Sequence, residues 1–179
     1  VIRLSECIFR RLAPEGETEQ ITTADLVTLA ALARSGKAID LEQENIIVNT
    51  VRLGHTLITA AMIPPERIQF IRNGDTPETV LELAARTGHT RYPVSASADA
   101  ADIHSYIVTK KAVPASKDDI AGMIAAARPI KSVNRRDTLM TALRCMLRHK
   151  EHLLSVTDDR GRCVGIVTLE DIASELLST

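Results

Sequence analysis

Apolar and polar positions first follow a helical spacing along this chain. A polar, acidic stretch, PEGETEQITT, is followed by apolar residues three and four positions apart. This order predicts a short helix that begins at a cap, Thr22 or Thr23, and ends at Gly36.

A second helix is expected to follow the first. Asp40 is a suitable N-cap, and the segment LEQENIIVNTVRL places its apolar residues on one helical face. Because a residue ahead of proline is pushed out of helical geometry, this helix must end before Pro64. We expect it to run from Leu41 to about Ala61.

An internal repeat begins at Ile68. The segment IQFIRNGDTPETVLELAARTGHTRYPVSAS aligns without a gap with IKSVNRRDTLMTALRCMLRHKEHLLSVTDD, 62 positions later. The pair Asp75 and Asp137 and the pair Val94 and Val156 both keep this offset. Such self-similarity predicts two copies of one supersecondary unit.

Each copy predicts a short strand, a helix capped by Asp-Thr, two strands and a closing helix. The paired strands are expected over 92–96 and 103–109 in the first copy, and over 153–157 and 163–168 in the second. One copy is too small to bury its sheet face alone, so the copies should pack sheet against sheet about a pseudo-twofold axis and leave clefts between them. The predicted fold class is therefore α/β (α+β), two β-α-β-β-α repeats preceded by N-terminal helices.

Composition narrows the classes of function. The net charge is −1 and aromatic residues make up 2%, which argues against a nucleic-acid partner because neither a positive field nor stacking side chains are available. Three cysteines without CxxC spacing favour a reducing compartment, the cytosol by default. No stretch reaches the roughly 18 to 20 apolar residues of a membrane span. Because the chain opens with Val1 in an amphipathic pattern, we interpret it as a piece of a longer protein.

Three motifs now carry a resemblance: LEQENIIVNTVRL, GHTRYPV at 88–94 and EHLLSVTDDRGRCVGIVTLEDI at 151–172. Together with the repeat they resemble a tandem CBS (Bateman) module of the CorC/HlyC magnesium and cobalt efflux family, which is related to the CNNM transporters. The expected division is 1–56 as a helical linker region, 57–115 as the first CBS repeat and 116–179 as the second.

The resemblance implies a regulatory module and no enzyme. In that family a membrane domain precedes the module, so the implied location is the cytoplasmic face of the membrane. The implied ligand is an adenine nucleotide, ATP or AMP, with or without Mg²⁺, and the implied assembly is a homodimer through the repeats. The alternative is a ligand-free scaffold that only pairs subunits.

The motif GIVTLED contains the most informative candidate site. Thr168 ends a strand and begins a helix, where free N–H groups favour an anionic group, and Asp171 lies in the same turn. From spacing alone the pair is more often a capping box. The resemblance instead implies that both residues bind the ribose. After a loop that is two residues longer in the first copy, the offset becomes 60, so Lys111 stands at the position of Asp171 and that repeat lacks the acidic residue.

Four further residues complete the candidate nucleotide site. Arg91 lies between a helix and a strand, where its guanidinium would reach phosphates or form an ordinary surface ion pair. Ile130 and Val133 are candidates for an adenine pocket, with core packing as the alternative, and Lys131 is a candidate for the same mouth.

Neither a metal site nor catalysis is predicted. Cys145 and His149 share a helix face, but His152 follows the end of that helix and no fourth ligand is evident. The other histidines, His55, His89 and His104, lie in separate segments and accompany no activated nucleophile.

Overall fold

A computed structural model describes residues 22–109 and 127–178 of the chain. It divides into two compact units, 1–44 and 45–179, and each is described by itself. The second unit contains both predicted repeats.

The first unit contains helix α2, Thr23–Ser35. Its N-cap is Thr22, which forms a capping box with Asp25: the hydroxyl accepts a bond from the Asp25 N–H at 3.3 Å, and the carboxylate accepts one from the Thr22 N–H at 2.7 Å. Gly36 closes the helix. Both predicted ends are confirmed.

Helix α3, Leu41–Leu53, begins in the first unit and continues in the second. Asp40 accepts a hydrogen bond from the Gln43 N–H at 2.8 Å, which confirms the predicted cap. The predicted extension to Ala61 is wrong, because the helix ends at Leu53, one residue before Gly54.

Tertiary pairing explains the early end of α3. Leu57 is extended and forms an antiparallel bridge with Thr138, while the Ile58 N–H donates to the Asp137 carbonyl at 2.9 Å. The Ile58 side chain is 0% exposed. Ile58 is the first residue of a short 3-10 turn, η1 (Ile58–Ala60). Burial of Ile58 together with these hydrogen bonds outweighs helix continuation through Gly54, a poor helix former.

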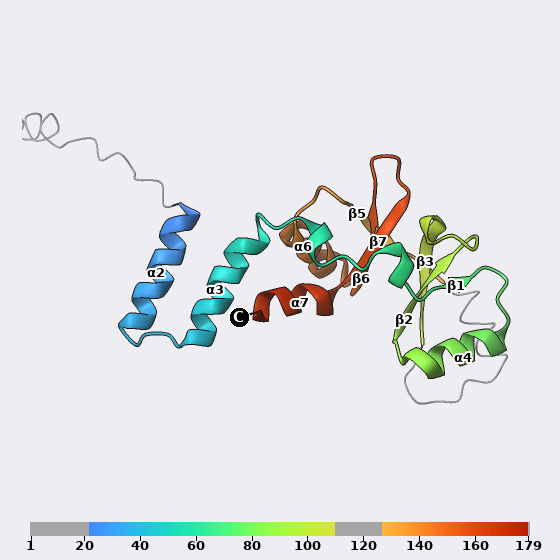
Figure 1. Ribbon diagram of the computed structural model, residues 1–179, viewed down its shortest axis with the longest axis horizontal. Helices are drawn as coiled ribbons and strands as arrows, with labels where there is room; N and C mark the ends of the chain where they lie inside the picture. The colour runs from blue at the N-terminus through green and yellow to red at the C-terminus, as the bar shows by residue number, and fades with distance from the viewer. Residues whose placement is uncertain (1–21, 110–126, 179) are drawn as a thin grey trace, which may run out of the picture. The chain divides into compact units, whose positions relative to one another are not determined.

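The first sheet has four strands in the order β1-β2-β3-β4. Their bounds are β1 Ile71–Arg72, β2 Arg91–Ser95, β3 Ile103–Val108 and β4 Arg128–Pro129. β1 pairs parallel with β2, and the other pairs are antiparallel. Helix α4, Pro77–Thr87, covers one face and packs Val80 against Tyr92 and Ile107 (Figure 1).

The second sheet has the order β5-β6-β7 and repeats this plan. Its strands are β5 Lys131–Asn134, β6 Leu153–Thr157 and β7 Cys163–Thr168; its helices are α6 Leu139–His149 and α7 Leu169–Leu177 (Figure 1). Both helices pack on the core built around Val156 and Val167. β5 pairs parallel with β6 in the same way that β1 pairs with β2.

The predicted fold class and its two-strand pairs are therefore confirmed to within one residue at most ends. One strand differs from the prediction, and some predicted features lie outside the described residues. Strand β4 was not predicted; it comes from the sequence range assigned to the second repeat and yet pairs with β3. The closing helix expected in the first repeat and Lys111 lie outside the described residues. The domain division into 1–56, 57–115 and 116–179 stays a prediction.

A third apolar cluster joins the repeats. Ile68, Ile103 and Tyr106 of the first repeat pack with Leu153 and Ile166 of the second. The Tyr106 hydroxyl also donates to the Glu151 carboxylate at 2.6 Å. The two sheets therefore bury each other's inner faces, as the repeat predicted.

Candidate functional site

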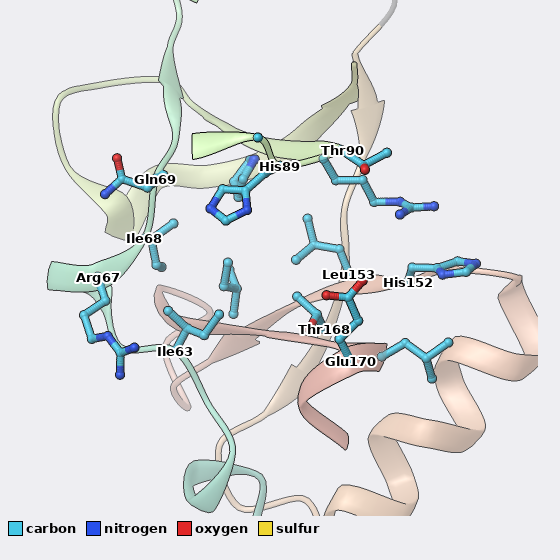
Figure 2. A pocket seen from close by; sticks show the side chains of 15 residues that line it. Ile63, Arg67, Ile68, Gln69, His89, Thr90, His152, Leu153, Thr168 and Glu170 are labelled. Atoms are coloured by element: carbon cyan, nitrogen blue, oxygen red, sulfur yellow. The ribbon is translucent and has the colours of Figure 1, made fainter. Parts of the chain in front are cut away.

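A cavity of about 240 Å³ lies between the two repeats (Figure 2). Four segments far apart in sequence line it: residues 63–69 ahead of β1, called the linker below, the start of β2, the start of β6, and the junction of β7 with α7. The lining residues that carry polar or charged side chains are Arg67, Gln69, His89, Thr90, Arg91, His152, Thr168 and Glu170.

Equivalent helix ends bring the first and second repeats to the same cavity. Gly88 is the C-cap of α4 and Lys150 is the C-cap of α6, both with left-handed backbone at φ 66° and φ 56°. Each turn sends the chain directly into a strand, so that residues 89–91 and 152–153 reach the cavity. Glycine adopts this left-handed conformation without strain, whereas Lys150 adopts it with the strain expected of a residue that carries a Cβ.

The linker forms one wall. The Ile63 N–H donates to the Ile166 carbonyl at 2.8 Å, and the Ile166 N–H donates back to the Ile63 carbonyl at 3.0 Å. This close approach requires Gly165, because a Cβ there would lie 2.4 Å from the Met62 side chain and 2.8 Å from the Ile63 carbonyl oxygen. Ile63 and Ile166 both line the cavity, so the glycine shapes the wall.

Thr168 is the N-cap of α7 and lines the cavity. Its N–H and hydroxyl donate to Asp171 Oδ2 at 2.8 and 2.6 Å, and its Oγ1 accepts from the Asp171 N–H at 3.2 Å. The capping box that spacing favoured is therefore present. Within the described part of the chain, Asp171 Oδ1 accepts no hydrogen bond and is not fully buried. One carboxylate oxygen thus serves the helix and the other is open to a further donor.

The other candidate residues fall into three places. Arg91 lines the cavity beside Thr90 and forms no ion pair among the described residues. Val133 is 7% exposed and belongs to the core under α6 and α7, while Ile130 packs against the cluster between the repeats. Lys131 is exposed and does not line the cavity. The structure therefore brings Arg91 and Thr168 together, with Asp171 one turn behind Thr168.

Sequence reasoning missed Arg67, His89 and His152 as cavity residues. Figure 2 shows Arg67 on the linker side and the His89 imidazole projecting from the first repeat into the space between the sheets. The signal that was available is the 62-residue offset, which makes Thr90 equivalent to His152 and Arg91 equivalent to Leu153. No sequence signal placed Arg67 opposite them.

Charge in the cavity favours an anion. Arg67 and Arg91 contribute two fixed positive charges against the single carboxylate of Glu170. The N-terminal end of α7 adds N–H groups and the positive end of a helix dipole next to Thr168. The guanidinium groups and the helix terminus match a ligand that carries phosphate groups, whereas Asp171, whose Oδ1 is open, is not among the residues that line the cavity.

The bond between Tyr106 and Glu151 lies next to this site, because Glu151 immediately precedes His152. Burial of Tyr106 raises the pKa of its phenol, and the hydrogen bond to the Glu151 carboxylate raises this pKa further. The phenol stays protonated at neutral pH and donates across the interface between the repeats.

Metal ligands are not gathered in the part of the chain that the structure describes: no group of three or more His, Cys, Asp or Glu residues is placed to hold an ion. His149 ends α6, and His152 lines the cavity beyond the turn at Lys150. Among residues 22–109 and 127–178, no helix has both the length and the apolar character needed to cross a bilayer.

Comparison with known proteins places this geometry among relatives. The CBS domain family model matches residues 118–178. A Mycobacterium tuberculosis protein described as uncharacterized is 27% identical over 164 residues, 89% of this chain and 47% of that protein. The magnesium and cobalt efflux protein CorC of Escherichia coli is 23% identical over 151 residues, 80% of this chain and 50% of that protein. The chain thus spans about half the length of the curated relatives it matches.

Solved structures share the fold. The CBS domain of the bacterial CNNM/CorC family Mg²⁺ transporter superposes with a TM-score of 0.75 at 24% identity, covering 88% of this chain and 97% of that one. The same domain in complex with ATP gives a TM-score of 0.66 at 24% identity, covering 75% and 96%. A CBS-domain pair with bound AMP from Klebsiella pneumoniae gives 0.55 at 24% identity, covering 69% and 99%. The resemblance indicated by the sequence motifs is confirmed.

Proposed function

We propose that this chain is a regulatory module that binds an adenine nucleotide between its two repeats. The match to the CBS domain model and the similarity to CorC and to CBS-domain structures support this proposal. The ligand is ATP or AMP, with or without Mg²⁺. The module controls an attached membrane domain that transports ions, magnesium or cobalt, and it works at the cytoplasmic face of the membrane as a homodimer. It is a binding module and not an enzyme.

One observation carries the proposal: the cavity combines two arginines with the start of α7. The guanidinium groups of Arg67 and Arg91 are suited to phosphate oxygens, and neither arginine forms an ion pair among the described residues. The ATP and AMP complexes of structures with the same fold support an adenine nucleotide over other phosphate ligands.

The ribose is proposed to bind beside Thr168. Asp171 Oδ1 is the free acceptor for a ribose hydroxyl, while Oδ2 keeps the capping box intact. Both roles of Asp171 then coexist, one on each oxygen. Ile130 and Lys131 are proposed at the base and at the mouth of the adenine site. Val133 supports this strand from the core and does not touch the base.

A route from the cavity to α3 is available through α7. The N-terminal end of α7 lines the cavity, and at its other end the Asn49 side-chain amide donates to the carbonyls of Leu176 and Ser178 at 3.1 and 2.8 Å. Asn49 lies on α3 and is 5% exposed. We infer that α3, which ends at Leu53, is the mechanical link between the nucleotide site and the attached membrane domain.

Calorimetric titration with ATP and AMP, each with and without Mg²⁺, tests the proposal. Asp171→Ala should weaken binding roughly tenfold to a hundredfold, because a hydrogen bond to a charged group contributes about 1.5 to 3 kcal/mol. Asp25→Ala is the matched control, since it removes the same kind of capping box from α2 in the other unit. No heat from any of the four ligands would refute nucleotide binding.

A dimerisation scaffold without ligand is the second candidate. The self-satisfied capping box of Thr168 and Asp171 favours it, because α7 needs no ligand to complete its N-terminus. The replacement of the acidic residue by Lys111 in the first repeat favours it as well. The scaffold predicts an unchanged melting temperature at millimolar ATP, with a dimer still present in sedimentation.

A further inference from the structure

Two histidines face the cavity with free imidazole nitrogens. The backbone of His89 is fixed, because its N–H donates to the Tyr92 hydroxyl at 3.1 Å and its carbonyl accepts from the Thr109 hydroxyl at 3.0 Å. The carbonyl of His152 accepts from the Leu169 N–H at 3.1 Å. Neither ring forms a hydrogen bond within the described residues, and both residues are exposed.

We propose that His89 and His152 take up protons when a phosphate-bearing ligand enters the cavity, so that this ligand binds more tightly as the pH falls. The inference rests on the proposed nucleotide site and adds a regulation of that site. It turns the nucleotide module into one that also responds to acidification of its compartment.

The charged groups around the two imidazole rings determine how a bound ligand changes their protonation. Among the described residues that line the cavity, Arg67 and Arg91 carry positive charges and Glu170 a negative one, and the carboxylate of Glu151, hydrogen bonded to Tyr106, directly precedes His152 in the chain. The Tyr92 ring lies 5.9 Å from the His89 ring, and its hydroxyl is hydrogen bonded with the Thr87 hydroxyl at 2.6 Å. A bound phosphate makes the net charge around the imidazoles more negative, since it brings two or more negative charges next to them.

Histidine changes its charge between about pH 5 and pH 8, which is the range in which this change matters. A group that is more protonated in the complex than in the free protein makes binding tighter as protons are added. Each protonated ring becomes an additional charge-assisted donor to phosphate oxygen.

The test is titration calorimetry with Mg²⁺-free ATP and with adenosine, in buffers of different ionisation enthalpy, near pH 8 and near pH 6. Proton uptake follows from the dependence of the observed heat on the buffer. The double variant His89→Gln, His152→Gln removes both titrating groups, and His104→Gln is the matched control, because His104 does not line the cavity.

For the wild-type chain and the His104→Gln variant, ATP affinity should rise about tenfold between the two pH values, with net proton uptake. In the double variant only the smaller contribution of ATP's own phosphates should remain, and adenosine should show none. Equal proton uptake by the wild-type chain and the double variant would overturn the inference and leave the nucleotide site standing. Absence of ATP binding at both pH values would overturn the proposed function itself.

Discussion

Gly165→Ala tests the contact between the linker and β7 most directly. The new Cβ would lie 2.4 Å from the Met62 Cγ and Sδ atoms and 2.8 Å from the Ile63 carbonyl oxygen. The methionine side chain is flexible and moves at small cost. The Ile63 carbonyl is backbone and is held by the Ile166 N–H at 3.0 Å, so relief there must lengthen a hydrogen bond.

The magnitude follows from these contacts. Overpacking costs about 1 to 3 kcal/mol. Two weakened backbone bonds, each contributing about 0.5 to 1.5 kcal/mol, add to that cost. The lower entropy of the unfolded Ala chain offsets about 0.4 to 1 kcal/mol. We therefore expect a net loss of about 1 to 5 kcal/mol in the free energy of unfolding, measured by urea denaturation with an unchanged m-value.

A double-variant cycle separates the two contacts. Met62→Ala together with Gly165→Ala removes the side-chain clash and keeps the clash with the Ile63 carbonyl, so only part of the loss should be recovered. Because Ile63 and Ile166 line the cavity, ATP affinity should fall in the single variant as well. A free energy of unfolding within about 0.5 kcal/mol of wild type, with the cavity wall unmoved, would refute the close approach described above.

Three further substitutions test other contacts by chemical denaturation. Asn49→Ala should cost about 1 to 3 kcal/mol, because it leaves the carbonyls of Leu176 and Ser178 without the Asn49 donor. A free energy of unfolding equal to that of the wild-type chain would contradict a stabilising role of these two hydrogen bonds. Tyr106→Phe should cost about 1.5 to 3 kcal/mol near pH 7, because it removes the hydrogen bond to Glu151. The folded-state pKa of the phenol is raised, so this contribution is complete below the ordinary tyrosine pKa of about 10 and is lost as the pH rises through the folded-state pKa. The stability curves of the wild-type chain and the variant should therefore converge at alkaline pH. Ser155→Ala should be neutral or more stable by up to about 1 kcal/mol, because the buried Ser155 hydroxyl has no hydrogen-bond partner among residues 22–109 and 127–178; a clear loss of stability would show that it has one.

Local chemistry explains what the sequence could predict of the fold. The caps at Thr22 and Asp40 lie within three residues of the N–H groups they bind, so the helix starts follow from nearby residues. The repeat offsets, 62 before and 60 after the longer loop of the first copy, correctly aligned β2 with β6 and β3 with β7, because equivalent residues meet equivalent neighbours. The end of α3 did not follow, since it depends on Asp137, which lies far along the chain from Ile58.

The site was predicted in part for the same reason. Thr168 and its box with Asp171 form one local turn, so their spacing was sufficient. Arg67, His89 and His152 lie on separate segments that meet only after the two sheets have packed. For Val133 the sequence left an adenine pocket and core packing open, because strand alternation cannot say which face holds a ligand; its side chain is buried in the core.

Strand β4 makes the two repeats inseparable. It belongs to the second half of the sequence, yet its pairing of Pro129 with Ser105 and of Arg128 with Tyr106 completes the sheet of the first half. A fragment that stops before Arg128 would leave the outer edge of β3 with unpaired N–H and carbonyl groups, an edge that invites pairing with foreign chains and aggregation. We therefore expect proteolysis or truncation between the halves to destabilise the sheet of the first repeat, so the two repeats are best expressed and engineered together.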